Sequence, residues 1–353
     1  MDVTEQILAE AAPHPGGPVA AAFAARIQAR ELAELSKRAT RSYPAVRARP
    51  EPDCGLRTPF QRDRDRIVHS KAFRRLKYKT QVFIAPVGDH YRTRLTHTLE
   101  VTQVARTVAR ALGLNEDLVE AIGLGHDLGH TPFGHLGEDA LDRCLSERFG
   151  TGFRHNEHSL RIVDVLERDG AGLNLTEPVR DGILHHSWRA LEPSTQEGMI
   201  VRIVDRVAYI NHDIDDAVRA GVIAVQDLPA EAISVLGDTG SRRIDALVHD
   251  LVEHSAAAGT IVQGERAGTS MSELREFMFD RVYLGAEARR EHAKIERVVR
   301  TLFDHYCAEP AEIPSSIPAG DLARRVTDYL AGMTDRFCIR TFEELSVPVA
   351  FAP

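Results

Sequence analysis

The amino-acid sequence predicts an all-α protein. Apolar residues recur at intervals of three and four along most segments, as on one face of an amphipathic helix, and the alternation typical of strands is sparse. Polar N-cap residues and stop-signal glycines, such as Asn115 and Gly113, stand at the ends of these segments. At 353 residues, the chain is long enough for one large domain or two ordinary domains with a sizeable core.

Residues 1–56 are predicted to form an N-terminal arm or linker. They contain an alanine-rich helical patch at 20–39, but prolines and glycines flank it, and the segment ends in the run YPAVRARPEPDCG. Helical signals dominate from Arg57 onward. We therefore place the start of the main helical core at that residue.

Two consecutive helices are predicted in the most informative part of the chain. The first begins near His97, carries apolar residues at helical spacing, and stops at Gly113. The second takes Asn115 as its N-cap and ends at Gly129. This boundary places the His-Asp pair at 126–127 in the final turn of the second helix, just before a loop that contains glycine and proline.

Further helices are predicted from the same apolar spacing over 138–149, 156–168, 177–187, 197–219, 243–256, 284–306 and 320–333. The loop-rich, glycine- and serine-containing stretch near 255–275 is the best candidate for a subdomain boundary or a mobile loop. The expected organisation is therefore a core over 57–240 and a C-terminal helical part over 241–353 that packs on this core.

Charge, cysteine usage and hydropathy restrict the class of protein. The formal net charge is −8, which argues against wholesale coating of nucleic acid. The 4 cysteines form no CxxC pair, which is typical of reduced thiols in the cytoplasm. No apolar run fits a signal peptide or a membrane span, so we expect a cytoplasmic protein without a membrane partner.

Histidines gather in two short segments of otherwise ordinary helical sequence. THTLEV contains His97, and GHDLGHTPFGH contains His126, Asp127 and two further histidines. A metal site needs imidazole and carboxylate ligands on rigid elements, with open positions for water and substrate. Adjacent helical residues point about 100° apart. His126 and Asp127 can therefore share an ion only at a helix end or beside another helix, and His97 and Asp205 lie on such helices.

The pattern H…HD…D is more specific than any of its parts. A lone histidine is more often a surface or hydrogen-bonded core residue, and a single His-Asp dipeptide is weak evidence for metal binding. The full pattern resembles the HD-domain metal-dependent phosphohydrolases. Six segments are similar to the successive signatures of the deoxyguanosine triphosphate triphosphohydrolase family, and together they span about residues 57 to 337: RTPFQRDRDRIVHSKAFRRLKYKTQVF, GDHYRTRLTHTLEV, GLGHDLGHTPFGHLGEDAL, RHNEHSLRIV, VDRVAYINHDIDDA and DYLAGMTDRF.

This resemblance implies a fold, a reaction and a metal site. The fold would be an HD-domain helical fold with additional C-terminal helices, and the reaction would convert a deoxynucleoside triphosphate to deoxynucleoside and inorganic triphosphate. The implied metal ligands are His97, His126, Asp127 and Asp205, which would hold one divalent ion per site. Such ligands suit Mn, Fe, Zn, Co or Ni more readily than Mg alone, but they do not choose among these six metals.

The resemblance also implies a catalytic group of His130, His135, Glu138 and His155. Cleavage at the α-phosphorus needs an activated water and an acid that protonates the departing 5′ oxygen, and histidine suits both tasks. Glu138 lies three residues after His135, so on a helix it faces the same site and can orient that imidazole. For His155, a polar position near a helix N-terminus is the alternative, and the assignment of acid and base stays open.

Substrate contacts are expected first among basic residues, because a triphosphate carries roughly four negative charges that a catalyst must neutralise. Residues 57–79 are the most basic stretch of the chain, although such runs are often solvated helix faces. The resemblance places nucleotide contacts at Arg57, Lys77, Gln81 and Arg94, with Arg206 as a further phosphate contact.

The segment DRVAYINHD predicts a sugar contact. Asp205, Tyr209 and Asp213 recur every four residues, which on a helix places them along one stripe that leads away from the metal. An amphipathic helix with a core tyrosine and a solvated aspartate would show the same spacing, and the resemblance favours the sugar contact. Tyr209 is then expected to pack on the deoxyribose, and Asp213 is expected to accept a hydrogen bond from the 3′ hydroxyl.

Two other functions are compatible with the metal set. An HD nucleotidase or phosphodiesterase would use the same ligands on another phosphate ester, and a nucleic-acid- or nucleotide-binding regulator would keep the fold without turnover. The segments outside the metal set favour a deoxynucleoside triphosphate triphosphohydrolase. We expect a deoxynucleoside triphosphate as substrate, a homo-oligomer, and a nucleotide or single-stranded DNA as a candidate effector.

Overall fold

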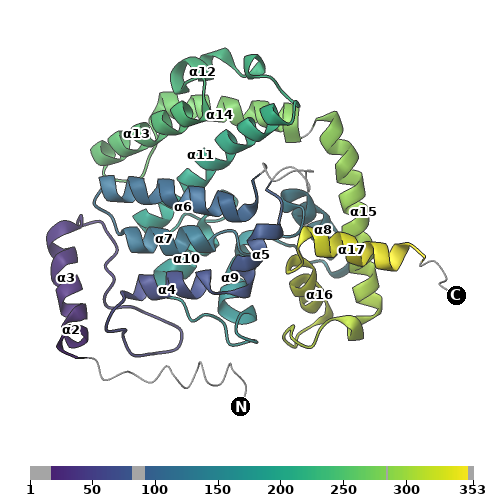
Figure 1. The fold of residues 1–353 in the computed structure, drawn as a ribbon, viewed down its shortest axis with the longest axis horizontal. Helices are drawn as coiled ribbons and strands as arrows, with labels where there is room; N and C mark the ends of the chain where they lie inside the picture. The colour runs from purple at the N-terminus through teal and green to yellow at the C-terminus, as the bar shows by residue number, and fades with distance from the viewer. Residues whose placement is uncertain (1–16, 82–91, 284, 349–353) are drawn as a thin grey trace.

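The computed structural model confirms the all-α prediction (Figure 1). It describes residues 17–81, 92–283 and 285–348. Within these ranges, β-type pairing is limited to two isolated bridges, one between Arg47 and Thr176 and one between Thr80 and Thr93. No helix in the same ranges combines the length and the apolar character needed to cross a bilayer.

The described part of the chain is built almost entirely from helices. In chain order they are α2 (Pro18–Ala21), α3 (Phe23–Glu34), α4 (Pro59–Val68), α5 (Lys71–Arg75), α6 (Arg94–Ala111), α7 (Glu116–Gly125), α8 (Gly134–Phe149), α9 (His155–Arg161), α10 (Glu177–His185), α11 (Gln196–Arg219), α12 (Ala230–Leu236), α13 (Gly240–Ala258), α14 (Glu265–Met278), α15 (Ala286–Ala308), α16 (Leu322–Ala331) and α17 (Asp335–Ser346). Helices α9 and α14 continue into π-helical turns over Ile162–Leu166 and Phe279–Tyr283.

Helix α7 lies at the centre of the first hydrophobic core. It packs against α4, α6, α10 and α11, and its Leu118 and Ile122 are fully buried. Gly182 allows α10 to pack close to α7, because a Cβ at this position would lie 2.4 Å from the Cδ1 atom of Ile122. Helices α12, α13 and α14 lie beyond α11, away from α7 (Figure 1). The helix that leads into the His-Asp pair is therefore held by four neighbours.

Local capping explains where α6 and α7 begin. Thr93 and Thr96 form a capping box, so α6 starts at Arg94, three residues before the predicted start at His97. Asn115 caps α7 as predicted, because its side chain accepts hydrogen bonds from two backbone N–H groups in the first turn. Helix α7 ends earlier than predicted, at Gly125, so the His-Asp pair lies on the turn that follows the helix rather than inside it.

The turn after α7 is fixed against the start of α9. The Ser159 hydroxyl donates to the carbonyl of His126 at 2.7 Å and accepts from the N–H of Gly129 at 2.8 Å. A side chain at Gly129 would collide with this helix, because a Cβ there would lie 2.2 Å from the backbone nitrogen of Ser159. The glycine in HDLGH therefore permits the contact that positions the His-Asp pair.

A second hydrophobic core is built by α8, α15, α16 and α17. It includes Leu141 and Leu145 of α8, Leu302 and Phe303 of α15, and Val326 of α16. Helix α8 belongs to the central part of the chain, yet it packs on α15 and α16 (Figure 1). The segment GHDLGHTPFGH thus continues directly into a helix that packs on the C-terminal part.

The predicted loop over 255–275 is wrong. Helix α13 continues to Ala258 and α14 begins at Glu265, so a short connection replaces the long loop. The glycine and serine content of this stretch misled the prediction, because Ala267, Met271 and Leu274 recur at helical spacing and bury one face of α14. Burial of this face outweighs the low helix propensity of the glycine and serine residues.

Two buried polar side chains join the two cores beneath the loop that carries the histidines. The Lys79 ammonium donates to the carbonyl of His130 and, at 2.8 Å, to the carbonyl of Ala331 in α16. Asp335 of α17 accepts from the N–H of Thr80 at 2.9 Å and from the N–H of Phe133 at 3.0 Å. The C-terminal helices therefore support the backbone of the histidine loop directly.

We expect the substitution Lys79→Met to reduce the pH dependence of stability. Burial lowers the pKa of Lys79 from 10.5 to about 7. Between these pH values the unfolded chain holds a proton that the folded chain has released, so the free energy of unfolding rises with pH. The rise is at most about 1.4 kcal/mol per pH unit. Urea unfolding at several pH values across this window measures the slope for each protein.

The control for this test is Lys71→Met, because the Lys71 side chain is exposed and pairs with Asp169 at the surface. Lys71→Met should keep the wild-type slope, whereas Lys79→Met should show a flatter one. Equal slopes in wild type and Lys79→Met would mean that Lys79 stays charged in the folded protein over this range.

Candidate active site

Four side chains from three parts of the fold converge into one buried cluster, the HD cluster: His97, His126, Asp127 and Asp205. His97 comes from the first turn of α6, Asp205 from α11, and the other two from the turn after α7. The Nε2 atom of His97 lies 3.0 Å from Asp205 Oδ1 and 3.9 Å from Asp127 Oδ2. The Nε2 atom of His126 lies 3.7 Å from Asp205 Oδ1 and 3.5 Å from Asp127 Oδ1.

The hydrogen bonding of His126 fits a bound cation. Its Nδ1 lies 2.6 Å from the carbonyl of Gly123, which can only accept, so Nδ1 carries a proton and Nε2 offers a lone pair whenever the ring is neutral. That Nε2 atom is buried and has no hydrogen-bond partner among the residues that the structure describes. Burial opposes a charge on this ring, but Asp127 and Asp205 outweigh it and raise the pKa of His126 to about 9. The cluster therefore favours a positive charge, and its residues fit a divalent ion.

Arg94 lies beside the HD cluster with unused donors. Its Nη1 pairs with Asp127 Oδ2 at 2.7 Å, and both side chains are buried. Within the described part of the chain, the Nε and Nη2 atoms of Arg94 are buried without a hydrogen-bond partner. Leaving buried donors unpaired is costly, so these N–H groups are suited to an anionic ligand that enters the site.

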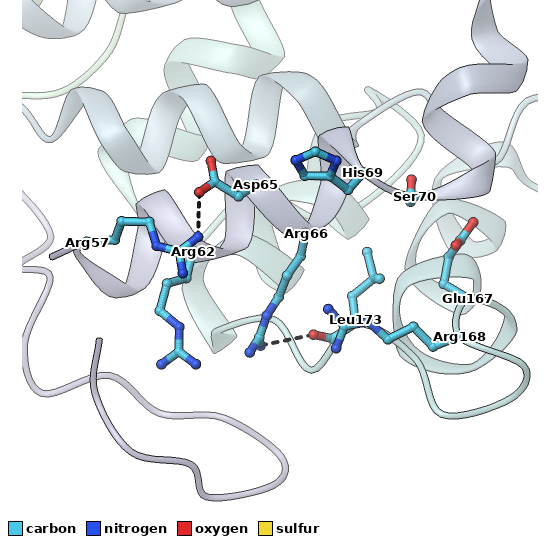
Figure 2. A pocket seen from close by; sticks show the side chains of 9 residues that line it. All are labelled: Arg57, Arg62, Asp65, Arg66, His69, Ser70, Glu167, Arg168 and Leu173. Carbon is cyan, nitrogen blue, oxygen red and sulfur yellow. Dashed lines mark hydrogen bonds and ion pairs between the residues drawn. The ribbon is translucent and has the colours of Figure 1, made fainter. Parts of the chain in front are cut away.

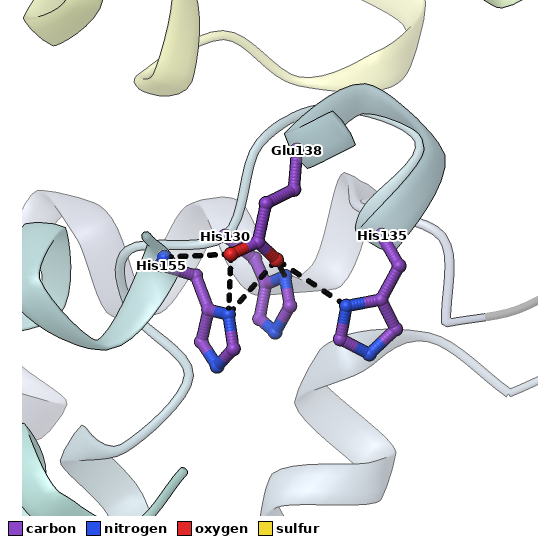
Figure 3. Close-up of side chains that lie close together, drawn as sticks. All are labelled: His130, His135, Glu138 and His155. Atoms are coloured by element: carbon purple, nitrogen blue, oxygen red, sulfur yellow. Dashed lines mark hydrogen bonds and ion pairs between the residues drawn. The ribbon is translucent and has the colours of Figure 1, made fainter. Parts of the chain in front are cut away.

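A second cluster, the His/Glu cluster, contains His130, His135, Glu138 and His155 (Figure 3). The Glu138 carboxylate lies between the imidazoles, with His155 Nδ1 at 2.9 Å and His135 Nδ1 at 3.3 Å. The rings of His130 and His155 stack with centroids 3.9 Å apart. His130 also connects the two clusters, because its Nε2 lies 3.2 Å from Asp127 Oδ1.

Electrostatics separate the roles of these four groups. Burial raises the pKa of Glu138, but the neighbouring imidazoles outweigh burial and hold that pKa far below its usual range, so Glu138 is a carboxylate. Burial together with the nearby Arg94 and His155 lowers the pKa of His130 well below its usual range, so this ring is neutral. His135 differs from both because its side chain is 71% exposed. It is the imidazole of this cluster that solvent and substrate can reach.

Two further buried histidines, which were not identified from the sequence, lie next to these clusters. His186, at the C-cap of α10, has its ring centroid 5.0 Å from that of His126, and its Nε2 lies 3.2 Å from His155 Nε2. The ring centroid of His212 of α11 lies 6.2 Å from that of His97. The dipeptide His-His at the end of a predicted helix was the available signal for His186.

The predicted sugar-contacting stripe lies on α11, but its partners come from elsewhere. The Tyr283 hydroxyl donates to Asp213, and burial raises the pKa of Asp213 to about 7. Tyr209 is largely buried against the first core. The guanidinium of Arg206 lies over the ring of Trp188, 5.1 Å from its centroid. Neither Tyr283 nor Trp188 was identified from the sequence.

The structure does not bring all predicted nucleotide contacts to the histidine clusters. Arg57 pairs with Asp65 at 2.8 Å and lines a separate cavity of about 290 Å³ that contains no member of either cluster (Figure 2). Lys77 is exposed, with its ammonium over the ring of Tyr78. Gln81 does lie close to the site, because its backbone carbonyl oxygen and the Nη2 atom of Arg94 both border Gly134. The roles of Arg57 and Lys77 as nucleotide contacts therefore stay predictions.

Comparisons with known proteins agree with this geometry. A family model described as the HD domain matches residues 94–210, and a second one, described as a phosphohydrolase-associated domain, matches residues 261–344. All four members of the HD cluster lie inside the first match.

Several relatives are similar over most of the chain. A deoxyguanosinetriphosphate triphosphohydrolase-like protein of Caldanaerobacter subterraneus subsp. tengcongensis is 53% identical, with 86% of this chain and 89% of the relative covered. Proteins of the same description are 48% identical in Clostridium perfringens, covering 84% of this chain and 89% of the relative, and 44% identical in Desulfatibacillum aliphaticivorans, covering 92% and 97%.

We expect Asp205→Asn to lose its divalent metal. The substitution keeps the size of the side chain but removes one of the two carboxylate charges that face His97 and His126. Elemental analysis after chelation and reconstitution with Mn²⁺ counts the bound metal, with Asp245→Asn as the control because Asp245 is exposed on α13. The wild type and the control should also gain thermal stability with added Mn²⁺, since a ligand that binds the folded state stabilises it. Full occupancy in Asp205→Asn would remove Asp205 from the site.

Proposed function

The chain belongs to the deoxyguanosinetriphosphate triphosphohydrolase-like proteins and is a metal-dependent phosphohydrolase of the HD-domain family, and from this premise we propose that it hydrolyses a deoxynucleoside triphosphate to deoxynucleoside and inorganic triphosphate. The observation that carries the proposal is the junction of two clusters. A site fit for a divalent ion is joined through Asp127 and His130 to a carboxylate that orients an exposed imidazole, His135.

The HD cluster would hold the ion on which the activity depends. When bound there, the ion supplies positive charge that polarises a phosphate oxygen and makes a neighbouring water more acidic. Arg94 adds a fixed guanidinium whose free N–H groups can bind the phosphates of the substrate. These residues neutralise the charge that develops at the α-phosphorus.

His135 would carry the proton in the reaction. Attack of water at the α-phosphorus forms a P–O bond, breaks the bond to the 5′ oxygen, and leaves that oxygen in need of a proton. His135 is accessible, and its Nδ1 is held by the Glu138 carboxylate, which leaves Nε2 directed away from Glu138. The ring can then accept the proton of water or give a proton to the 5′ oxygen.

The sugar would lie along α11. Tyr209 and Asp213 are one and two helical turns beyond Asp205, so a nucleotide with its phosphates at the HD cluster extends over Tyr209 toward Asp213. Tyr209 would limit the space for a 2′ hydroxyl. Asp213, held by Tyr283, would accept a hydrogen bond from the 3′ hydroxyl. A 2′,3′-dideoxynucleotide lacks the 3′ hydroxyl, so the buried carboxylate of Asp213 would lose this hydrogen bond and the specificity constant would fall.

The products identify the reaction. We expect each active deoxynucleoside triphosphate, incubated with the Mn²⁺-loaded protein, to yield deoxynucleoside and triphosphate on ion-exchange chromatography. In ¹⁸O-water the label should enter the triphosphate and not the 5′ hydroxyl. Release of pyrophosphate with a nucleoside monophosphate would instead support an HD nucleotidase of another type. Absence of turnover with every deoxynucleotide would favour a binding protein.

We expect His135→Ala to lower turnover by roughly 10²-fold or more while the metal content stays unchanged, because a positioned acid or base contributes about that much. Steady-state kinetics with elemental analysis on the same samples separates the two effects. His249→Ala is the matched control, since His249 is exposed on α13, where it pairs with Asp245. Turnover equal to wild type in His135→Ala would assign the proton transfer to another group.

A further inference from the structure

Trp188, the single tryptophan of the chain, belongs to neither cluster. It lies on the connection between α10 and α11, two residues after His186, and its side chain is 50% exposed. The guanidinium of Arg202 lies over its ring at 4.8 Å from the centroid, and that of Arg206 at 5.1 Å. Both arginines belong to α11, and Arg206 directly follows Asp205 of the HD cluster. A half-exposed indole thus lies against the helix that supplies one of the candidate metal ligands.

The connection that carries Trp188 is fixed at two points. Arg202 donates to the carbonyl of Leu191 at 2.6 Å. The N–H and hydroxyl groups of Ser194 donate to Asp181 of α10 at 2.8 and 2.9 Å. Arg202 therefore holds the connection, and with it Trp188, in place against α11.

Arg206 lacks an anionic partner. Within the described residues, its Nε atom is buried without a hydrogen-bond partner, and no carboxylate lies within ion-pair distance of its guanidinium. Burial and the nearby Arg275 lower the pKa of Arg206. A partly buried cation beside a second cation, with no carboxylate to balance it, is in an unfavourable position until an anion binds.

An indole can hold this guanidinium without neutralising it. A carboxylate would also fix Arg206, but it would occupy the N–H groups and cancel the charge. The face of an aromatic ring instead attracts a cation through its quadrupole. A guanidinium stacked on a ring keeps the N–H groups in its own plane free for a phosphate. Trp188 can therefore restrict Arg206 to one position while the charge of Arg206 stays available.

We propose that Trp188 is a positioning residue, which holds the guanidinium of Arg206 ready to bind a phosphate group of the substrate. This inference rests on the proposed function, because Arg206 follows Asp205 on α11, at the end of the helix stripe where the triphosphate would bind. Trp188 acts through Arg206, so its loss should weaken the binding of phosphate groups and leave the binding of the nucleoside part unchanged.

A stacking surface for the nucleobase is the alternative role of an exposed indole beside a nucleotide site. The two roles differ in the part of the substrate that they need. Inorganic triphosphate can bind Arg206 but has no base, whereas deoxyguanosine has a base but no phosphate. These two compounds therefore separate the two roles without any turnover.

The test is equilibrium dialysis of the full-length protein, with Mn²⁺ in excess, against inorganic triphosphate and, separately, against deoxyguanosine. We expect Trp188→Ala to bind triphosphate roughly 3- to 10-fold more weakly than wild type, as for loss of a half-exposed cation–π contact. Its affinity for deoxyguanosine should not change. Trp188→Phe should restore most of the triphosphate affinity, because phenylalanine keeps an aromatic face. Leu191→Ala is the control for the connection, since the Leu191 side chain is 78% exposed, and it should match wild type.

A double-mutant cycle assigns the effect to Arg206. In the Arg206→Ala background, Trp188→Ala should cause no further loss of triphosphate affinity, because the cation that the indole holds is absent. Equal losses in both backgrounds would overturn the proposal. Weaker binding of deoxyguanosine by Trp188→Ala would overturn it in favour of base stacking.

The wild-type protein decides the question even if these variants fail to fold. Because Trp188 is the single tryptophan, its selectively excited fluorescence reports on this indole alone. We expect saturation with triphosphate to change that emission, since an anion at Arg206 alters the electric field at a ring 5.1 Å from the guanidinium. Unchanged emission at saturation would contradict the proposal. Failure of the proposed function appears separately, as wrong products or no products from a protein that binds triphosphate as expected.

Discussion

The buried carboxylate of Asp127 is the group on which the rest of the site depends. A charge removed from water costs several kcal/mol unless it is paired and hydrogen-bonded. Asp127 is paired with Arg94 at 2.7 Å and contacts His130 at 3.2 Å, while His97 and His126 lie within 3.9 Å. Burial raises the pKa of Asp127, but His126, His130 and Arg94 outweigh it and hold that pKa well below its usual range. One ionised carboxylate thus requires side chains from separate parts of the fold to meet at a single place.

The backbone around Asp127 is shaped to meet this requirement. Helix α7 ends at Gly125, and the following turn is tied to α9 by Ser159, at a distance that only glycine at 129 permits. The next residues, 130–134, are held from below by Lys79 and Asp335. Because Asp335 belongs to α17, the second core stabilises the loop that carries His130. The C-terminal helices therefore contribute to the active site through the backbone, without placing a side chain in either cluster.

The arrangement also explains how one site could combine charge neutralisation with proton transfer. Two buried groups of the His/Glu cluster have their protonation set by neighbours: Glu138 is held as a carboxylate and His130 as a neutral ring. The one exposed imidazole, His135, lies at the edge of the same cluster. Buried groups with fixed protonation can orient an ion and phosphates, whereas an accessible ring can exchange protons with water and substrate.

The sequence by itself determined the all-α class, the cap of α7 at Asn115, and the grouping of His97, His126, Asp127 and Asp205 as candidate ligands. These properties are encoded locally, in apolar spacing, capping residues and motif order, so they can be recognised along the chain. The loop expected over 255–275 was wrong because burial against other helices, which local composition does not report, stabilises α14. Only the tertiary structure decided that Arg57 lines a separate cavity, that Tyr283 reaches Asp213, and that His186 faces His155. The reason is physical: which nitrogen of an imidazole carries the proton, and which group it faces, depends on acceptors brought together by packing between segments far apart in the sequence.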